Sequence, residues 1–292
     1  MLSKKIALIG ANGQLGSDIL NSLKADKKYK IFSLTHQDIE ILNFKKTYEI
    51  LNQIKPDIVI NTAAYHKVDE AELNPDKALS LNSLAQKNLA QICQQNNWAV
   101  VYISSDYVFG QEKRHKPYRE SDSPAPVNVY GVSKICGEYF TRYASDKHLI
   151  IRTSGLYGAK GSSSKGLNFV ELMIKLGKEK GEVSVVSDQV LSPTYTINLA
   201  NNLKSLLDLE VYGLFHASSQ GSCSWWEFAS TIFKFLSMDV KCKSVTSKSF
   251  KSIVKRPSYS VLENDNLSKL KLDQMKTWQQ NLRDYLKEKK YL

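Results

Sequence analysis

Tyr130 and Lys134 stand four residues apart in a stretch whose pattern predicts a helix. One helical turn separates them, so their side chains point the same way. A phenol with a pKa of about 10 is a poor acid–base group at neutral pH, but an ammonium group beside it stabilises the phenolate and lowers that pKa. The pair therefore indicates a proton-transfer site, although the same spacing also occurs on ordinary surface helices.

Two serines, Ser104 and Ser105, follow a buried apolar run that predicts a strand. In α/β folds ligands bind at the carboxyl ends of such strands. A hydroxyl at that edge can hydrogen-bond a substrate carbonyl and hold it in line with the tyrosine. Serines after strands often only form turns, but the position of Ser105 suits a third catalytic group. The sequence contains no Ser/His/Asp hydrolase motif, and its five histidines are scattered.

A glycine-rich turn lies between the first predicted strand and the helix that follows, with Gly10, Gly13 and Gly16 at its key positions. Glycines in this context let a pyrophosphate approach the backbone N–H groups at the helix N-terminus. A turn needs glycine for positive φ even where nothing binds, but this position favours dinucleotide binding. The spacing is wider than in ordinary dehydrogenases and is typical of short-chain dehydrogenase/reductase folds.

The end of the second predicted strand bears on the choice of cofactor. An acidic residue there accepts the ribose hydroxyls of NAD, and its absence leaves room for the 2′-phosphate of NADP. Here Thr35 and His36 occupy the tip, and the first acid is Asp38. The sequence favours NADPH, and NADH stays an alternative because Asp38 or Glu40 is near enough in the chain to turn inward.

These residues need a frame that brings them together. Short β-branched runs alternate with helical patterns through the first two thirds of the chain, which indicates βαβ units and a parallel sheet. The predicted strands are residues 6–9, 31–34, 57–61, 99–104 and 149–152, and the predicted helices are 15–23, 48–54, 75–96 and 129–143. We expect an α/β fold, a Rossmann-type doubly wound parallel sheet with a smaller α/β C-terminal substrate lobe.

The pattern loosens after residue 153, which indicates a second lobe. The elements predicted there are a loop rich in glycine and serine at 158–166, a helix at 169–180, a short strand at 183–186 and a returning sheet strand at 213–216. We expect an NAD(P)-binding Rossmann domain over residues 1–152, with 195–217 returning to it. The substrate-binding lobe would take residues 153–194 and 218–292.

Several motifs occur in the order seen in one family. The chain resembles the dTDP-4-dehydrorhamnose reductases, which are extended short-chain dehydrogenase/reductases, over nearly its whole length. The segment Ser104-Ser105-Asp106-Tyr107-Val108-Phe109 is similar to the family's S-T-D-Y-V-F, with serine in place of threonine at 105. The other matching segments are residues 10–16, 56–65, 68–72, 128–134 with 137–138, 168–170, 188–189 with 192–194, 223–225 with 227–229, and 256–257 with 259–260 and 262.

The resemblance implies a reaction. It is hydride transfer from NAD(P)H to C4 of a 4-keto-6-deoxy-L-hexose carried on dTDP, the last step to dTDP-L-rhamnose in nucleotide-sugar and polysaccharide biosynthesis. In that reaction Tyr130 would protonate the C4 oxygen, Lys134 would hold the nicotinamide ribose and tune Tyr130, and Ser105 would hydrogen-bond the carbonyl. A positioned acid typically supplies roughly 10² to 10⁴-fold in rate.

The resemblance also implies binding residues. Those expected to bind the cofactor are Gly10, Asn12, Gly13, Gln14, Leu15, Gly16, Thr35, Glu40, Ile41, Ala63, Ala64, Tyr65, Ser104, Tyr130 and Lys134. Those expected to bind the substrate are Val68, Ser105, Asp106, Tyr107, Asn168 and Arg256. Among the latter, Asn168 and Arg256 would face the nucleotide diphosphate, and Val68 and Tyr107 would border the sugar.

Three positions depart from the family pattern. Gly155 stands where a tryptophan usually borders the sugar, which leaves the identity of the hexose open. Leu191 replaces a frequent glycine and Asn198 a frequent aspartate, and we interpret both as changes in local packing. Some family members bind magnesium through acidic residues at a dimer contact. We assign no metal ligands in this sequence, and both a magnesium requirement and a homodimer stay open.

Composition and charge exclude several classes of protein. Hydrophobic residues make up 42% of the 292 and charged residues 24%, which excludes a disordered, collagenous or coiled-coil chain. The formal charge of +11 concentrates in residues 241–292, with 13 Lys/Arg against 5 Asp/Glu. Because no helix-turn-helix or RNP signature accompanies it, we expect no nucleic-acid partner. Solvated lysines, or modest steering of a phosphate-bearing substrate, account for the excess.

We expect a cytoplasmic protein without a membrane segment. No apolar run approaches the roughly 18 residues that a membrane helix needs. The apolar stretch at residues 6–9 runs directly into the glycine turn, unlike a signal peptide. The four cysteines, Cys93, Cys136, Cys223 and Cys242, lie far apart without metal-ligand spacing, so we expect reduced, mostly buried thiols and neither zinc nor disulfides.

Two alternative functions stay open. The same catalytic group would serve a related nucleotide-sugar reductase or epimerase acting on another hexose, an alternative that Gly155 supports. An epimerase would keep its dinucleotide bound and need no added NADPH. The other alternative is a non-catalytic regulatory subunit on this fold, as in the methionine adenosyltransferase β subunit. Intact Tyr130, Lys134 and Ser105 disfavour it, because a binding scaffold has no chemical need for all three.

Overall fold

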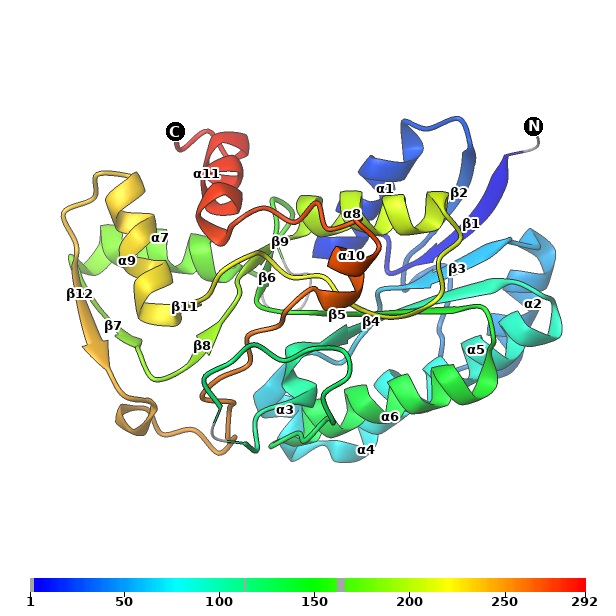
Figure 1. The fold of residues 1–292 in the computed structure, drawn as a ribbon, viewed down its shortest axis with the longest axis horizontal. Coiled ribbons are helices and arrows are strands. Elements are labelled where there is room, and N and C mark those ends of the chain that lie inside the picture. Colours follow the sequence, from blue (N-terminus) through cyan, green and yellow to red (C-terminus); the bar gives the residue numbers. More distant parts are fainter. Residues whose placement is uncertain (1–2, 113, 162–165) are drawn as a thin grey trace.

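A six-stranded parallel sheet forms the centre of the computed structural model, which describes residues 3–112, 114–161 and 166–292. Every pairing in this sheet is parallel. From one edge to the other the strands are β10 (Gly213–His216), β5 (His148–Thr153), β4 (Ala99–Ser105), β3 (Ile58–Asn61), β1 (Lys4–Ile9) and β2 (Tyr29–Leu34) (Figure 1). The return of β10 to the sheet agrees with the sequence prediction.

Helices cover both faces of the sheet (Figure 1). One face carries α1 (Gln14–Lys24) and α8 (Thr196–Asp208), and the other carries α2 (Phe44–Ile54), α5 (Ala85–Gln95) and α6 (Val129–Ala144). Strands shielded on both sides read as continuous apolar runs rather than as an alternating pattern. The arrangement is a Rossmann-type doubly wound sheet, and the predicted fold class is confirmed.

The strand order changes direction between β1 and β3, because β2 lies outside β1 and β4 lies outside β3. In open α/β sheets ligands bind in the crevice at the carboxyl ends of the strands on either side of such a point. The glycine turn follows β1, and residues 62–65 follow β3. The topology therefore brings two predicted cofactor-binding segments to one place.

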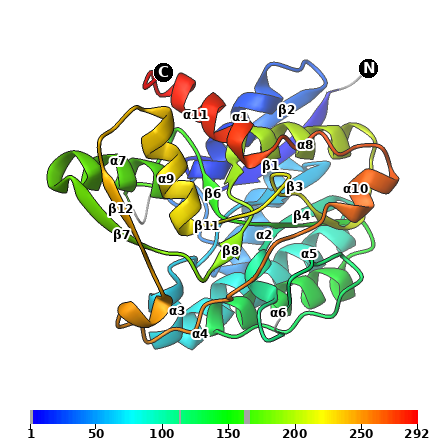
Figure 2. The ribbon, with the colours of Figure 1, turned by 60° about the vertical axis from the view of Figure 1, so that its left-hand side comes forward.

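A second group of elements packs around its own apolar core beside the sheet (Figure 2). Its helices and its two parallel strands are α7 (Phe169–Lys180), α9 (Trp225–Phe235), α11 (Trp278–Glu288), β7 (Glu182–Val186) and β12 (Lys241–Val245). They come from residues 153–194 and 218–292, the two ranges assigned to the substrate lobe. We propose that this group is that lobe and that the division of the chain into two domains follows these ranges.

Shorter elements lie between and around the two groups. They are α3 (Val68–Leu73), α4 (Pro75–Leu79), α10 (Asp265–Lys269), and the paired strands β6 (Leu156–Tyr157) with β9 (Thr194–Tyr195) and β8 (Val190–Leu191) with β11 (Cys223–Ser224). The sequence analysis assigns no helix to α8, α9 or α11. Asparagines in α8 and bulky aromatic residues in α9 lower helix propensity, and packing against the neighbouring core overrides it.

The helix predicted over residues 75–96 is not a continuous α-helix. Between α4 and α5 the chain makes a π-helical turn, η1 (Ser80–Leu84). Within this turn Asn82 accepts a hydrogen bond from Tyr65 N (2.8 Å) and donates one to Tyr65 O (3.1 Å). Its carbonyl oxygen accepts from the Tyr102 hydroxyl at 2.8 Å. The turn thus ties the loop after β3 to strand β4, and such π-turns are frequent at functional sites.

The elements predicted over residues 158–186 have different outcomes. Part of the predicted loop at 158–166 lies outside the described residues, whereas α7 and β7 coincide with the predicted helix and strand. None of the helices in the described ranges has the length and apolar character that crossing a membrane requires.

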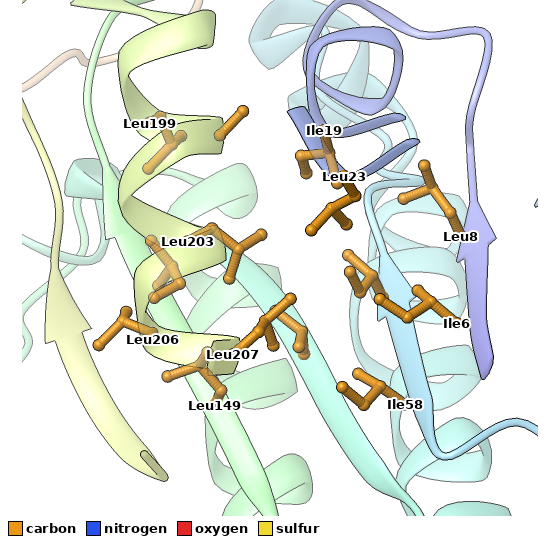
Figure 3. Packing of buried hydrophobic residues seen from close by; sticks show 14 of the residues in the cluster. Ile6, Leu8, Ile19, Leu23, Ile58, Leu149, Leu199, Leu203, Leu206 and Leu207 are labelled. Carbon is orange, nitrogen blue, oxygen red and sulfur yellow. The ribbon is translucent and has the colours of Figure 1, made fainter. Parts of the chain in front are cut away.

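An apolar cluster fills the space between the sheet and the helices α1 and α8 (Figure 3). In this cluster Leu203 of α8 faces Ile19 and Leu23 of α1, and Ile6 and Leu149 contribute from the strands beneath. All five side chains are buried. The contact joins the first helix to a residue 180 or more positions later, so it fixes helix α8 to the N-terminal part of the chain.

We expect Leu203→Ala to lower the free energy of unfolding by about 2–5 kcal/mol, because truncation removes apolar contacts and leaves a cavity. Urea unfolding followed by circular dichroism measures this change. The matched control is Leu209→Ala at the end of the same helix, where the side chain is 58% exposed and little should change. Equal effects of the two substitutions would contradict this account of the core.

Candidate active site

Close backbone contacts shape the glycine turn between β1 and α1. Gly10 has a φ of +78°, and a Cβ built there would lie 2.6 Å from Thr62 Oγ1. A Cβ at Gly16 would clash with the carbonyl oxygen of Gly10. Because only glycine fits both positions, the backbone stays bare where α1 begins, and bare N–H groups at a helix start bind anions. The turn fits the pyrophosphate of a dinucleotide.

In the rest of the turn, the backbone N–H groups are more available to a cofactor than the side chains are. Asn12 is exposed, and Gly13 is the N-cap of α1, where the described residues provide no capping side chain. The Gln14 Oε1 atom is buried and has no partner in the part of the chain that the structure describes. Leu15 packs into the apolar cluster. The first N–H groups of α1 are therefore left for a ligand.

Carboxylates near the end of β2 are engaged locally. Asp38 Oδ2 accepts hydrogen bonds from Thr35 N (2.8 Å) and Thr35 Oγ1 (2.7 Å), which lower the pKa of Asp38. Glu40 faces His36, with 3.4 Å between Oε2 and Nδ1. The side chain of Ile41 is buried in the core, so only its backbone can reach a cofactor. The acid that would select NAD is held in a turn, which agrees with the prediction of NADPH.

The loop after β3 is the third predicted cofactor segment. Asn61 Oδ1 accepts from Ala63 N at 3.0 Å, and Asn61 Nδ2 donates to the buried Gln86 at 2.9 Å. Ala64 continues the loop, and Tyr65 is fastened to the π-helical turn by the two hydrogen bonds described above. The backbone of this loop therefore has one fixed course beside the glycine turn.

Ser105, Tyr130 and Lys134 come together between β4 and α6. Asn128 caps α6 by accepting a hydrogen bond from Gly131 N at 2.9 Å. A Cβ at Gly131 would clash with the backbone that follows β4, so the helix starts directly against the strand end. Ser105 lies at that end and is hydrogen-bonded to Tyr130. Lys134 follows one turn later and is 1% exposed.

Burial governs the acid–base properties of Tyr130 and Lys134. It raises the pKa of Tyr130 to about 12, and the hydrogen bond with Ser105 opposes this only in part. It lowers the pKa of Lys134 to about 7, with Glu138 acting in the opposite direction. The sequence predicts a Tyr130 pKa lowered by lysine, but burial raises it, and the group that opposes the rise is Ser105 and not Lys134. Tyr130 therefore holds a proton at neutral pH that it can donate.

Asp106 lies beside Ser105 and is enclosed by protein. Its Oδ1 accepts from Ser105 Oγ at 2.9 Å, and its Oδ2 accepts from Ser154 Oγ at 2.9 Å and Ser260 Oγ at 2.6 Å. Burial raises the pKa of this carboxyl group. Because Ser154 follows β5 and Ser260 belongs to the C-terminal segment, the contacts position Ser105 from two directions. Contact of Asp106 with substrate stays a prediction.

Contacts connect two predicted substrate residues, Tyr107 and Arg256, to Tyr130. Arg256 donates to Asp69 Oδ2 at 2.7 Å and hydrogen-bonds Tyr107. Val68, the first residue of α3, directly precedes Asp69. The rings of Tyr107 and Tyr130 meet edge-on with centroids 5.7 Å apart. A phenol thus contacts the proposed acid directly and an arginine contacts that phenol, whereas contact of Val68 with the sugar stays a prediction.

Asn168 serves as the N-cap of α7. Its Oδ1 accepts from Glu171 N at 3.0 Å, and its Nδ2 donates to Gly158 O and to the Tyr285 hydroxyl, both at 2.9 Å. Both amide hydrogens are therefore used within the protein. These contacts explain an asparagine at this position without a ligand, and its contact with the diphosphate stays a prediction.

Nearly the whole chain matches one known family. Residues 4–291 match the family described as the RmlD substrate binding domain. The chain belongs to this family. It is 37% identical over 285 residues to the spore coat polysaccharide biosynthesis protein SpsK of Bacillus subtilis (strain 168), covering 98% of each chain. It is 32% identical over 292 residues to the dTDP-4-dehydrorhamnose reductase of Aggregatibacter actinomycetemcomitans, covering 96% of this chain and 97% of that one.

A solved structure agrees with this membership. The crystal structure of dTDP-4-dehydrorhamnose reductase from Bacillus anthracis str. Ames in complex with NADP superposes with a TM-score of 0.93. The two proteins are 39% identical, and the match covers 98% of this chain and all of the other. The family expected from the motifs is confirmed over the whole length of the chain.

Two departures from the usual RmlD family pattern, Gly155 and Leu191, contact each other. Gly155 has a φ of +52°, and a Cβ built there would lie 2.8 Å from Leu191 Cδ1 and 3.7 Å from Trp225. Leu191 is buried and therefore fills space beside the glycine. A bulky side chain at 155 would collide with leucine at 191, so the two changes belong together. Ser154, one residue earlier, is part of the Asp106 network.

A buried ion pair, which the sequence analysis did not identify, links the catalytic helix to the sheet. Arg152 of β5 donates to Glu138 of α6 through Nε (2.9 Å) and through a terminal nitrogen (2.6 Å), and both side chains are at most 2% exposed. Ser104 Oγ, predicted as a cofactor contact, donates to Glu138 Oε1 at 2.5 Å. The sequence shows that Glu138 lies one helical turn after Lys134. It does not show that Glu138 pairs with Arg152, because Arg152 lies on strand β5.

His216 is a further hydrogen-bond partner of Arg152. Burial lowers its pKa to about 3, so the ring is neutral. Nδ1 lies 3.0 Å from Tyr118 O and 3.1 Å from Glu263 O and therefore carries the proton. Nε2 is left to accept from Arg152 at 3.4 Å. The neutral ring adds no second positive charge to the buried arginine.

The described ranges contain neither a cluster of metal ligands nor a thiol with a lowered pKa. No group of three or more His, Cys, Asp or Glu residues there could hold a metal ion. The four cysteines are free; Cys93 and Cys223 are buried, and Cys136 and Cys242 are half-buried. Burial raises the pKa of all four thiols, so each stays protonated at neutral pH.

We expect Arg152→Met to lower the free energy of unfolding by about 3–5 kcal/mol, because it leaves Glu138 buried without its partner. The double variant Glu138→Met/Arg152→Met should lose much less, since both buried charges are gone. Urea unfolding measures both changes. Arg119→Met, which breaks the exposed pair with Glu263, is the control and should leave the urea midpoint close to that of the wild type. Additive losses in the double variant would refute a coupled pair.

Proposed function

We propose that the protein reduces the C4 keto group of dTDP-4-dehydro-L-rhamnose with NADPH to give dTDP-L-rhamnose, in nucleotide-sugar and polysaccharide biosynthesis. Membership of the RmlD family supports this, as do the names of its relatives. The observation that carries the proposal is the hydrogen bond between the buried Ser105 and the half-buried Tyr130 at the carboxyl end of β4, one turn before a buried Lys134. That arrangement supplies a proton and a hydroxyl at one point.

The residues at the switch point fit a dinucleotide cofactor. The bare backbone of the glycine turn would hold the pyrophosphate, and the loop of Ala63, Ala64 and Tyr65 would border the nicotinamide half. Thr35 and His36 would lie near the adenosine ribose. When bound, NADPH supplies the hydride. The NADP in the Bacillus anthracis relative supports this choice of cofactor.

Tyr130 is the acid in this proposal. Its pKa of about 12 keeps the phenol protonated, which is the form needed to protonate an oxygen that gains negative charge during reduction. Ser105 would hydrogen-bond that oxygen by turning toward it the one hydroxyl proton that it donates to Asp106 Oδ1 in this structure. Lys134 adds a positive charge that stabilises the phenolate once the proton has left. Each role uses a group already positioned by β4 or α6.

The charge and shape of three side chains suggest how they would bind the substrate. Arg256 would bind the nucleotide diphosphate, exchanging Asp69 for phosphate oxygens, because guanidinium pairs well with phosphate. Val68 and Tyr107 would border the sugar. A homodimer and a cytoplasmic location stay predictions.

The first test is NADPH oxidation at the nicotinamide absorbance band with enzymatically generated dTDP-4-dehydro-L-rhamnose, the product being identified by mass and NMR. The wild type should form dTDP-L-rhamnose. Tyr130→Phe should lose at least about 10²-fold in kcat while binding NADPH nearly as tightly, because only the proton donor is removed. Tyr139→Phe on the exposed face of the same helix is the control. Retained turnover in Tyr130→Phe would refute the assignment of the acid.

A second candidate function is reduction of another 4-keto nucleotide sugar. The contact of Gly155 with Leu191 favours it, because a position that usually holds a tryptophan beside the sugar is filled differently. NADPH binding without oxidation in the first assay would point to this candidate or to a regulatory subunit. A panel of 4-keto nucleotide sugars then separates the two.

The cofactor preference has its own test. We expect kcat/KM to be higher with NADPH than with NADH. The reason is that Asp38 is hydrogen-bonded to Thr35, so in the described structure its carboxylate is not available to the ribose hydroxyls of NADH. Steady-state rates with the two cofactors at one sugar concentration measure the ratio. A clear advantage for NADH would show the NADPH assignment to be wrong.

A further inference from the structure

We propose that Tyr102 is a positioning residue for Lys134, whose ammonium group it holds over the face of its ring by a cation–π contact. The Lys134 Nζ atom lies 4.1 Å from the centroid of the Tyr102 ring. The attraction of an ammonium ion to an aromatic face extends to about 6 Å and is strongest where water is excluded. Both side chains are 1% exposed. The proposal deepens the reductase function and rests on it for the role of Lys134.

Glu138 and the ring of Tyr102 are the two groups that favour the charged form of Lys134. Glu138 on the same helix is the carboxylate that faces it, but that carboxylate is occupied by Arg152. Within the described ranges no ion pair includes Lys134. Tyr130 and Cys136 are the other titratable groups near the ring, and both are neutral at pH 7 because burial raises their pKa values.

The ring is held rigidly in the orientation that the contact requires. Tyr102 sits in the middle of β4, opposite Ile150 on one neighbouring strand and Asn61 on the other. Its hydroxyl donates to Asn82 O at 2.8 Å. A Cβ at Gly137 would clash with that hydroxyl, so α6 lies directly against the ring. Burial raises the pKa of Tyr102, so the ring acts as a neutral phenol and not as a charged phenolate.

The consequence is that Lys134 keeps part of its positive charge at neutral pH although burial disfavours the charged form. Burial lowers the pKa of Lys134 to about 7. Removing the ring face removes a favourable partner of the ammonium form only, so the pKa should fall further. From the usual strength of buried cation–π contacts we expect a fall of about one pH unit. At pH 7 most of the enzyme would then lack the ammonium that stabilises the Tyr130 phenolate.

The test measures the titration of Lys134 directly by NMR on protein labelled with ¹³C at the lysine Cε positions. The signal is assigned by its loss in Lys134→Met. Tyr102→Leu should shift the midpoint down by about one pH unit, whereas Tyr102→Phe, which keeps the ring, should shift it by less than about 0.3. Phe140→Leu, which removes a surface contact with Lys87 from the same helix, should leave it unchanged. This readout needs no substrate, so it stands even if the proposed reaction fails.

A second series covers the case in which Tyr102→Leu does not fold. Phenylalanines with increasing ring fluorination at position 102 keep the shape and weaken the negative face, so the Lys134 midpoint should fall stepwise with fluorine content. The alkaline limb of the kcat profile should move by the same amount in an active enzyme. An unshifted midpoint in the leucine or fluorinated variants would overturn the proposal. A shift in Tyr102→Phe as large as that in Tyr102→Leu would assign the effect to the hydroxyl and overturn it as well.

Discussion

A salt bridge buried at the centre of the molecule, between Glu138 and Arg152, holds the catalytic helix α6 against strand β5. A charge removed from water is costly unless it is paired and fully hydrogen-bonded, and here Ser104 and the neutral His216 complete the shell. The pair fixes the orientation of α6 about its own axis. That orientation places Tyr130, two turns earlier on the helix, against the end of β4.

The same reliance on buried polar groups organises the other side of the site. Asp106 binds three hydroxyls that come from β4, from the end of β5 and from the C-terminal segment. A buried carboxyl group needs hydrogen-bond partners, so separating these segments would cost free energy by leaving Asp106 without them. Ser105 is positioned as a by-product of this network. The proposed substrate lobe is thereby joined to the catalytic group through one side chain.

Burial has opposite effects on the pKa values of Tyr130 and Lys134, the two groups proposed to handle the proton. It makes Tyr130 a weaker acid and Lys134 a weaker base, since neither charged form is well solvated. For a reduction this is useful, because the phenol keeps its proton until a nearby oxygen gains charge. The lysine must nevertheless stay cationic, and a neutral ring such as that of Tyr102 supports the charge without neutralising it.

The sequence by itself determined the parallel α/β fold, the glycine turn and the Tyr130–Lys134 pair, because each depends on local periodicity or short spacing. It did not reveal the Arg152–Glu138 pair, the π-helical turn at Asn82 or the helices α9 and α11 of the proposed second lobe. It also predicted a lowered Tyr130 pKa, whereas enclosure of the site raises it. Those features depend on partners far apart in the chain and on the exclusion of water, and both exist only after the elements have packed.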